Sequence, residues 1–248
     1  MSIQLKYVVP NACTALSMLC GFASVILSTQ GMFDLAAWCI TWGVLLDKLD
    51  GGVARLLNAS SNFGVQFDSF ADFIVFGMAP ACLFYFLCQP LVEKNLLSTY
   101  SLFAISGFYF VMTACRLAKF NSSTDSEDRN LFYGLPTTLS GAILSTAYLS
   151  WVSYFGKELS VEVMQFFLVA QIFMALLMVS PFILPKLKKR GIKAVDLFQF
   201  VNVGLAYLFA PMRIFPEYLL FLCLLYVVVG FSVGFIKYSK SDALQSQS

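Results

Sequence analysis

The chain has 248 residues and a formal net charge of +2; 59% of its residues are apolar, 12% are charged, and the mean hydropathy is +0.77. This composition excludes an ordinary soluble domain and predicts an all-α, polytopic integral membrane protein. The weak net charge comes with no basic surface pattern, so no nucleic-acid partner is expected.

Long apolar runs, separated by charged or turn-forming residues, predict about eight transmembrane helices. The weakest is 195–211, which is short and carries Asp196, and the alternative is a re-entrant or interfacial segment. The expected limits are 8–29, 33–57, 65–89, 98–120, 134–154, 162–185, 195–211 and 216–236.

These runs indicate one transmembrane domain, residues 1–238, because no polar stretch is long enough to form a core of its own. We expect a six-helix core within 1–185, two additional helices within 195–236, and a disordered polar tail at 239–248.

The basic residues predict an orientation. With eight helices, thirteen of the sixteen Lys and Arg residues fall on the side that holds both termini, and only Lys94, Lys157 and Arg213 fall on the other. Basic residues are enriched in cytoplasmic loops, so both termini are expected in the cytoplasm.

The first polar residues inside an apolar run are Asn11 and Thr14, just after Pro10. Proline is tolerated in a first helical turn, so one interpretation is plain helix initiation. The other is that both side chains form hydrogen bonds at a functional site.

Four aspartates follow within an otherwise apolar stretch. Asp47 and Asp50 are three residues apart, and Asp68 and Asp72 are four apart, so on helices each pair shares one face. The polar residues 58–62 between the pairs predict a turn, which allows two antiparallel helices to direct all four carboxylates to one place.

Carboxylates at membrane depth are costly and usually functional, although salt bridges to Lys48 and Arg55 are an alternative. The chain has no histidine, and a set of oxygen ligands suits Mg²⁺ or Mn²⁺. One or two such ions would neutralise the cluster, and Mg²⁺ commonly bridges phosphates. The sequence therefore predicts a phosphate-containing substrate, which Gly51, Gly52 and Gly64 would let approach the backbone and Arg55 would contact.

Further along, Arg116 and Lys119 end the fourth apolar run. For Lys119, a contact with the acceptor or the lipid phosphate and snorkelling of the ammonium group to the lipid headgroups explain the position about equally well. Arg116 lies one turn deeper and cannot lose its charge, so we expect it to face a cavity and to contact a phosphate or an acceptor carboxylate.

The pattern Asp-x-x-Asp-Gly-x-x-Ala-Arg, eight residues, then Gly-x-x-x-Asp-x-x-x-Asp, read from Asp47 to Asp72, resembles the signature of the CDP-alcohol phosphotransferases, membrane enzymes of phospholipid synthesis. The resemblance implies two Mg²⁺ or Mn²⁺ ions held by Asp47, Asp50, Asp68 and Asp72, with Asp72 as the catalytic general base. It also implies a homodimer. The asymmetry of the basic residues places the aspartate site, like both termini, on the cytoplasmic side. The residues implied to bind the CDP group are Asn11, Thr14, Asp50, Gly51, Ala54, Arg55 and Gly64.

The end of the fourth run, the sequence Phe-Tyr-Gly134-Leu-Pro136 and the sequence Ser180-Pro181-Phe are similar to the phosphatidylserine synthase branch of that family. One departure is Lys119, where the branch pattern has Arg. This resemblance implies transfer of the phosphatidyl group from CDP-diacylglycerol to the hydroxyl of L-serine, with release of CMP.

Three alternatives stay open. A sister enzyme would use glycerol phosphate or inositol phosphate as the acceptor, which requires extra cationic partners. A cation transporter would carry acidic residues across the whole membrane depth, whereas here they cluster at one face. If the protein were a non-catalytic scaffold, helix packing would provide no reason for the four aspartates.

Overall fold

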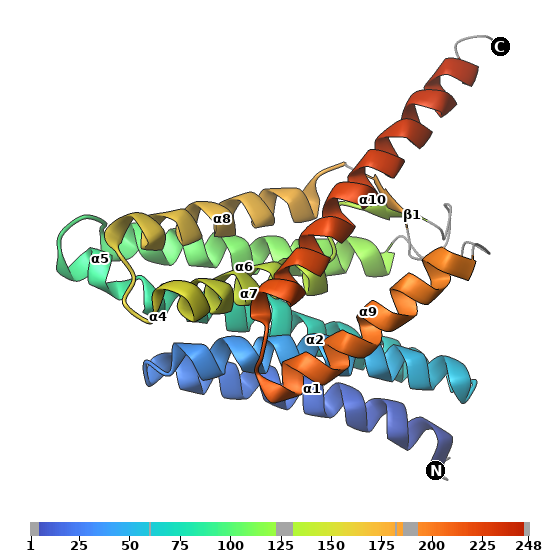
Figure 1. Ribbon diagram of the computed structural model, residues 1–248, viewed down its shortest axis with the longest axis horizontal. Helices are drawn as coiled ribbons and strands as arrows, with labels where there is room; N and C mark the ends of the chain where they lie inside the picture. Colours follow the sequence, from blue (N-terminus) through green and yellow to red (C-terminus); the bar gives the residue numbers. More distant parts are fainter. Residues whose placement is uncertain (1–4, 60, 123–130, 182, 186–192, 246–248) are drawn as a thin grey trace.

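A computed structural model describes the backbone of residues 5–59, 61–122, 131–181, 183–185 and 193–245. The protein is a polytopic helical membrane protein, as its composition predicts. Eight long helical segments run through the described residues, and α5 lies at the end of the bundle opposite the N-terminus (Figure 1). In chain order the helices are α1 Leu5–Thr29, α2 Phe33–Leu56, α3 Asn62–Asp72, the π-helix η1 Phe73–Met78, α4 Ala79–Leu87, α5 Gln89–Glu93, α6 Thr99–Ser122, α7 Thr137–Phe155, α8 Val161–Val179, α9 Lys193–Met212 and α10 Pro216–Gln245.

By length and composition alone, four stretches within the described residues could cross a membrane: Lys6–Thr29, Asn62–Glu93, Thr99–Ser122 and Val161–Val179. The second stretch joins α3, η1, α4 and α5. Of the other long helices, α2 carries both Asp47 and Asp50, and α7 is rich in hydroxyl side chains. Polar side chains of this kind lower the mean hydropathy of a helix, and a helix can carry them where they face other helices of the protein.

Several helix ends differ from the expected limits. The sixth apolar run was expected to be helical to residue 185, but α8 ends at Val179, where Ser180 has an extended backbone. Pro181 explains this, because a proline disfavours the helical conformation in the residue before it. Two short strands, β1 Leu131–Tyr133 and β2 Ile183–Pro185, then pair antiparallel, with Phe132 opposite Leu184.

At the C-terminus, α10 continues to Gln245, so its backbone is helical through most of the segment expected to be a disordered tail. Residues 246–248 lie outside the described part, as does the basic run at 186–190. A helix can extend beyond the membrane when, as here, its sequence contains no proline or glycine after Gly234.

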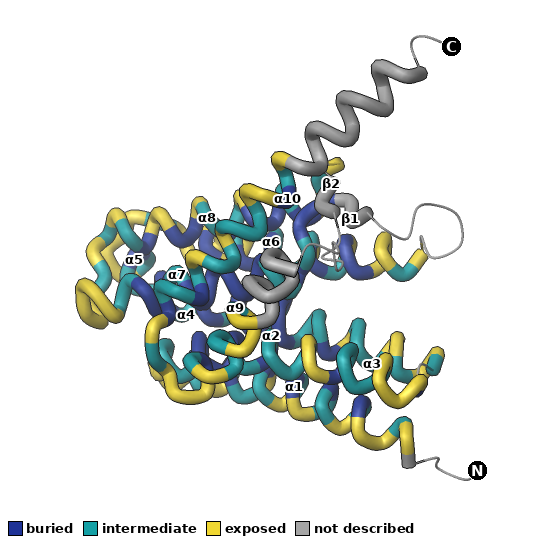
Figure 2. Tube along the Cα trace, turned by 45° about the vertical axis from the view of Figure 1, so that its right-hand side comes forward, coloured by how far each residue is buried: buried dark blue, intermediate teal, exposed yellow. Residues whose placement is uncertain are grey.

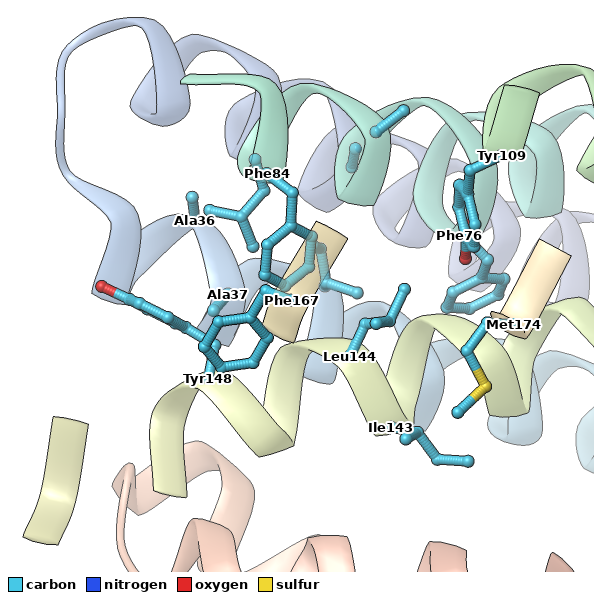
Figure 3. Close-up of a cluster of buried hydrophobic side chains, with 14 of the residues drawn as sticks. Ala36, Ala37, Phe76, Phe84, Tyr109, Ile143, Leu144, Tyr148, Phe167 and Met174 are labelled. Carbon is cyan, nitrogen blue, oxygen red and sulfur yellow. The ribbon is translucent and has the colours of Figure 1, made fainter. Parts of the chain in front are cut away.

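The core lies between α2, α4, α6, α7 and α8, where buried residues concentrate in Figure 2. Phe84 and Phe167 stack with their ring centroids 5.2 Å apart, and Tyr148 meets the edge of Phe167 (Figure 3). Such pairs stabilise a core beyond the effect of their buried area. They fix α4, α7 and α8 relative to one another.

At the end of the bundle far from the N-terminus, Asp34 joins three elements. It accepts a hydrogen bond from the hydroxyl of Tyr148, 2.9 Å away, and forms an ion pair with Lys157. The hydrogen bond and the charge of Asp34 raise the pKa of the exposed Lys157. This aspartate therefore has a structural role, apart from the other four.

Helix α9 packs on α2 through two hydrogen bonds. The indole N–H of Trp42 donates to the carbonyl of Ala210 at 2.7 Å, and the hydroxyl of Tyr207 donates to the carbonyl of Leu45 at 2.8 Å. Figure 1 shows α9 lying across α2. The segment expected at 195–211 is thus one continuous helix, packed on the helix that carries Asp47 and Asp50.

Candidate active site

The turn between α2 and α3 brings the two aspartate pairs together. Asn58 has a left-handed backbone (φ 47°) just after α2 ends, a conformation that asparagine tolerates better than most residues. Ser61 then caps α3, since its hydroxyl accepts a hydrogen bond from the N–H of Gly64 at 3.0 Å. The polar turn predicted at 58–62 therefore reverses the chain and starts the second aspartate helix.

Three of the four aspartates form one cluster. One carboxylate oxygen from each of Asp47, Asp50 and Asp68 lies within 4.8 Å of the other two. Asp72 adjoins the cluster, because the charges of Asp47 and Asp68 act on it. The structure thus brings together all four carboxylates predicted from the two spacings.

The cluster has the ligands for a divalent ion. Oxygens bound to one octahedral Mg²⁺ at about 2.1 Å are about 3 Å apart when adjacent and about 4.2 Å apart when opposite, so the three carboxylates, which lie within 4.8 Å of one another, would move closer to bind a single ion. Among the described residues, the one ion pair joins Lys157 and Asp34, so no basic side chain there forms a salt bridge with the cluster. A partly buried site of carboxylate oxygens without a salt-bridged basic partner fits Mg²⁺ or Mn²⁺.

A polar cavity of about 200 Å³ opens beside this cluster, between α1, α2 and α3. Its lining also includes the capping residue Ser61. All seven residues that the resemblance implied for CDP binding line it: Asn11, Thr14, Asp50, Gly51, Ala54, Arg55 and Gly64.

Thr14 connects α1 to the aspartate cluster. Its hydroxyl donates to Asp50 Oδ2 at 2.6 Å and lies 3.2 Å from the carbonyl of Pro10. Both Thr14 and Asp50 are buried. Of the two open interpretations of Thr14, the structure favours the functional one, since the side chain holds a carboxylate of the cluster.

Glycine has a steric role at this cavity. A Cβ atom on Gly64 would lie 3.2 Å from the Ser61 hydroxyl oxygen and 3.4 Å from Asn11 Oδ1. A side chain at position 64 would therefore crowd the space between α1 and α3. Gly52, by contrast, has no atom within 4 Å of such a Cβ, so the structure gives no packing reason for it.

The two basic residues of α6, Arg116 and Lys119, lie in different environments. Arg116 is 8% exposed, and its charge acts on Asp72, while its guanidinium carbon lies 5.3 Å from the centre of the Phe120 ring. Lys119 is exposed and does not line the cavity. Arg116 is thus buried where its charge acts on an aspartate, but it does not line the cavity, so its contact with a phosphate or an acceptor carboxylate stays a prediction. The exposure of Lys119 matches the headgroup alternative better.

Two further residues reach the cluster that the sequence did not single out for it. Thr138, in the first turn of α7, lies near enough to Asp47 to act on its carboxylate. Tyr207 of α9 lies where the charges of Asp47 and Asp50 act on it. The position of Thr138 just after Gly134-Leu-Pro136 was a usable signal, whereas Tyr207 in an apolar run gave none.

Comparison with known proteins decides the family. Residues 7–183 match the model of the CDP-alcohol phosphatidyltransferase family, so the match covers well over half of the chain. This chain belongs to the CDP-alcohol phosphatidyltransferase family. The matched residues include the four aspartates and every residue that lines the cavity, whereas α9 and α10 lie beyond them.

Relatives agree with this membership. The chain is 35% identical over 189 residues to the CDP-diacylglycerol–serine O-phosphatidyltransferase of Helicobacter pylori, covering 76% of each chain. It is 31% identical to the archaetidylserine synthase of Methanothermobacter thermautotrophicus, covering 73% of this chain and 71% of that one. Over nearly its whole length, 97% of this chain and 99% of the relative, it is 28% identical to a CDP-diacylglycerol–serine O-phosphatidyltransferase of Methanocaldococcus jannaschii.

Proposed function

We propose that this CDP-alcohol phosphatidyltransferase transfers the phosphatidyl group of CDP-diacylglycerol to the hydroxyl of L-serine, giving phosphatidylserine and CMP. The observation that carries the proposal is the convergence of four aspartates beside a cavity lined by all seven residues expected to bind CDP. The names of the relatives support serine as the acceptor.

Asp47, Asp50, Asp68 and Asp72 are the residues that would hold two Mg²⁺ or Mn²⁺ ions. Such ions, when bound, polarise the diphosphate and stabilise the charge that develops on the CMP oxygen. Thr14 keeps the Asp50 carboxylate directed at the cluster. Thr138 of α7 lies near Asp47 and would help to orient its carboxylate.

The remaining residues bind and orient the substrates. Asn11 and Gly64 form the wall of the cavity at α1 and α3, and Arg55 offers a bidentate cation to a phosphate. Asp72 accepts the proton of the serine hydroxyl as its oxygen attacks phosphorus and the bond to the CMP oxygen breaks. Arg116 lies next to Asp72 and would contact the acceptor carboxylate or the lipid phosphate; Lys119 would contact a headgroup.

A phosphorylated acceptor is the alternative within the family. It would need more cationic side chains than an amino-acid acceptor. Within the described residues, the basic side chains that line the cavity or act on Asp72 are Arg55 and Arg116. This small number favours an acceptor without a phosphate.

The membrane arrangement is also proposed. The excess of Lys and Arg on one side supports both termini and the active site in the cytoplasm, where CTP-derived substrates are made. The acyl chains of the substrate would lie between helices in the bilayer. We further propose one catalytic domain over residues 1–238 and a homodimer, which crosslinking in native membranes would check.

Purified protein, CDP-diacylglycerol and Mn²⁺ or Mg²⁺ provide the test, with L-serine, glycerol 3-phosphate or inositol phosphate added in parallel. The proposal predicts CMP release with serine, abolished by EDTA. Release only with a phosphorylated acceptor would keep the metal site and replace the acceptor. Absence of release with every acceptor would contradict the proposed function.

A further inference from the structure

The helix that carries Asp68 and Asp72 changes its winding directly after Asp72. The π-helix η1 begins at Phe73, and at its end the N–H of Ala79 donates to the carbonyl of Ile74, five residues back. One residue inserted into a helix turns the parts before and after it by about 100° relative to each other. The direction of Asp68 and Asp72 therefore depends on the π-helical turn that follows them.

Pro80 leaves a carbonyl of this turn without a helical donor. A proline has no N–H, so the carbonyl of Phe76, four residues earlier, lacks its usual partner. The hydroxyl of Tyr109 in α6 donates to that carbonyl at 2.8 Å. Figure 3 shows the Tyr109 side chain directed at Phe76, and both residues are fully buried.

A second hydrogen bond fixes the Tyr109 hydroxyl. It lies 3.1 Å from the hydroxyl of the fully buried Ser140 in α7. Because the single proton of Tyr109 goes to the Phe76 carbonyl, Ser140 donates to the Tyr109 oxygen. One hydroxyl thus joins the π-helical turn to two other helices in a dry environment, where hydrogen bonds are strong.

Close packing holds the same turn from two sides. A Cβ on Gly77 would lie 2.9 Å from Thr113 Cγ2 in α6, and a Cβ on Gly141 of α7 would lie 2.9 Å from Phe76 Cδ1. Neither contact leaves room for a side chain. The backbone around Phe76 therefore has little freedom as long as its carbonyl keeps the partner in α6.

We propose that Tyr109 is a positioning residue for the metal site, acting through the π-helical turn on the direction of the Asp68 and Asp72 carboxylates. The inference rests on the proposed function, which assigns these carboxylates to metal binding. Without the hydroxyl, the buried Phe76 carbonyl loses the donor that α6 supplies where Pro80 has no N–H, and the turn shifts to compensate. Asp68 and Asp72 then move relative to Asp47 and Asp50 on α2.

The alternative is that Tyr109 serves only the stability of the core. The chain offers a matched control for this, Tyr148, which is as deeply buried and whose hydroxyl donates at 2.9 Å to Asp34. It lies at the other end of the cluster in Figure 3, away from Phe76. A Tyr→Phe substitution at either position removes one buried hydroxyl and keeps the ring.

The experiment compares wild type, Tyr109→Phe, Tyr148→Phe and Ser140→Ala in detergent, with Mn²⁺ affinity measured from the electron paramagnetic resonance signal of free Mn²⁺. Thermal unfolding is recorded for each protein. Loss of an outer partner of a metal site weakens binding by roughly ten- to hundredfold. We expect the lower end of this range for Tyr109→Phe, a smaller loss for Ser140→Ala, and unchanged Mn²⁺ affinity for Tyr148→Phe even where its melting temperature falls.

Equal Mn²⁺ affinity in wild type and Tyr109→Phe would overturn the inference and leave the proposed function intact. Equal losses in the two tyrosine variants would also overturn it, since they would reflect core stability alone. If the wild-type protein bound no Mn²⁺, the proposed metal site would fail, and the inference with it.

Discussion

The hydrogen bond from Thr14 to Asp50 allows a quantitative test of the site. Thr14→Val keeps the shape of the side chain and removes the hydroxyl that lies 2.6 Å from Asp50 Oδ2. A hydrogen bond to a charged group contributes about 1.5–3 kcal/mol, and both partners are buried. At about 1.4 kcal/mol per factor of ten, the free-energy loss corresponds to a decrease of roughly 10- to 150-fold in kcat/KM.

Thr146→Val is the matched control. Thr146 is equally buried, but its hydroxyl donates at 2.6 Å to the carbonyl of Ala142 in its own helix, α7. We expect the control to keep its kcat/KM for CDP-diacylglycerol, measured by CMP release in mixed micelles. If the two valine variants lost the same activity, or if neither lost any, Thr14 would have no special part in holding Asp50.

Three further predictions concern other parts of the chain. Asp72→Asn should abolish turnover while CDP-diacylglycerol binding, measured by equilibrium binding, is retained; unchanged turnover would exclude Asp72 as the base. Arg55→Lys keeps the charge but loses the bidentate fork, so it should raise the KM for CDP-diacylglycerol about tenfold with little change in kcat; a lower kcat at unchanged KM would refute this role. Trp42→Phe removes the indole donor to Ala210, which should cost about 1 kcal/mol of stability and lower the melting temperature by about 2–4 °C; an unchanged melting temperature would show that this bond does not anchor α9.

Much of this architecture follows from local sequence rules. The limits of α2 and α6 were predicted to within a few residues, since turn-forming or charged residues interrupt the apolar runs there. The spacings of the four aspartates and the polar turn at 58–62 were sufficient to predict one carboxylate cluster. Charge is rare in this chain, so the functional positions stand out.

The parts that escaped prediction depend on contacts between distant segments. The π-helix after Asp72 has no periodic signal, because its carbonyl partner Tyr109 lies on another helix. The pairing of Phe132 with Leu184 likewise joins segments that are about fifty residues apart. The contact of Tyr207 with the Leu45 carbonyl depends on how α9 packs on α2, which apolar composition does not specify.

The most direct test of the central claim is to locate bound metal. Crystals of the protein grown with CDP-diacylglycerol and Mn²⁺ would be measured at the manganese absorption edge. We expect two anomalous peaks between Asp47, Asp50, Asp68 and Asp72, both absent from crystals grown with EDTA. Manganese found elsewhere, with these carboxylates free of metal while CDP-diacylglycerol is bound, would contradict it.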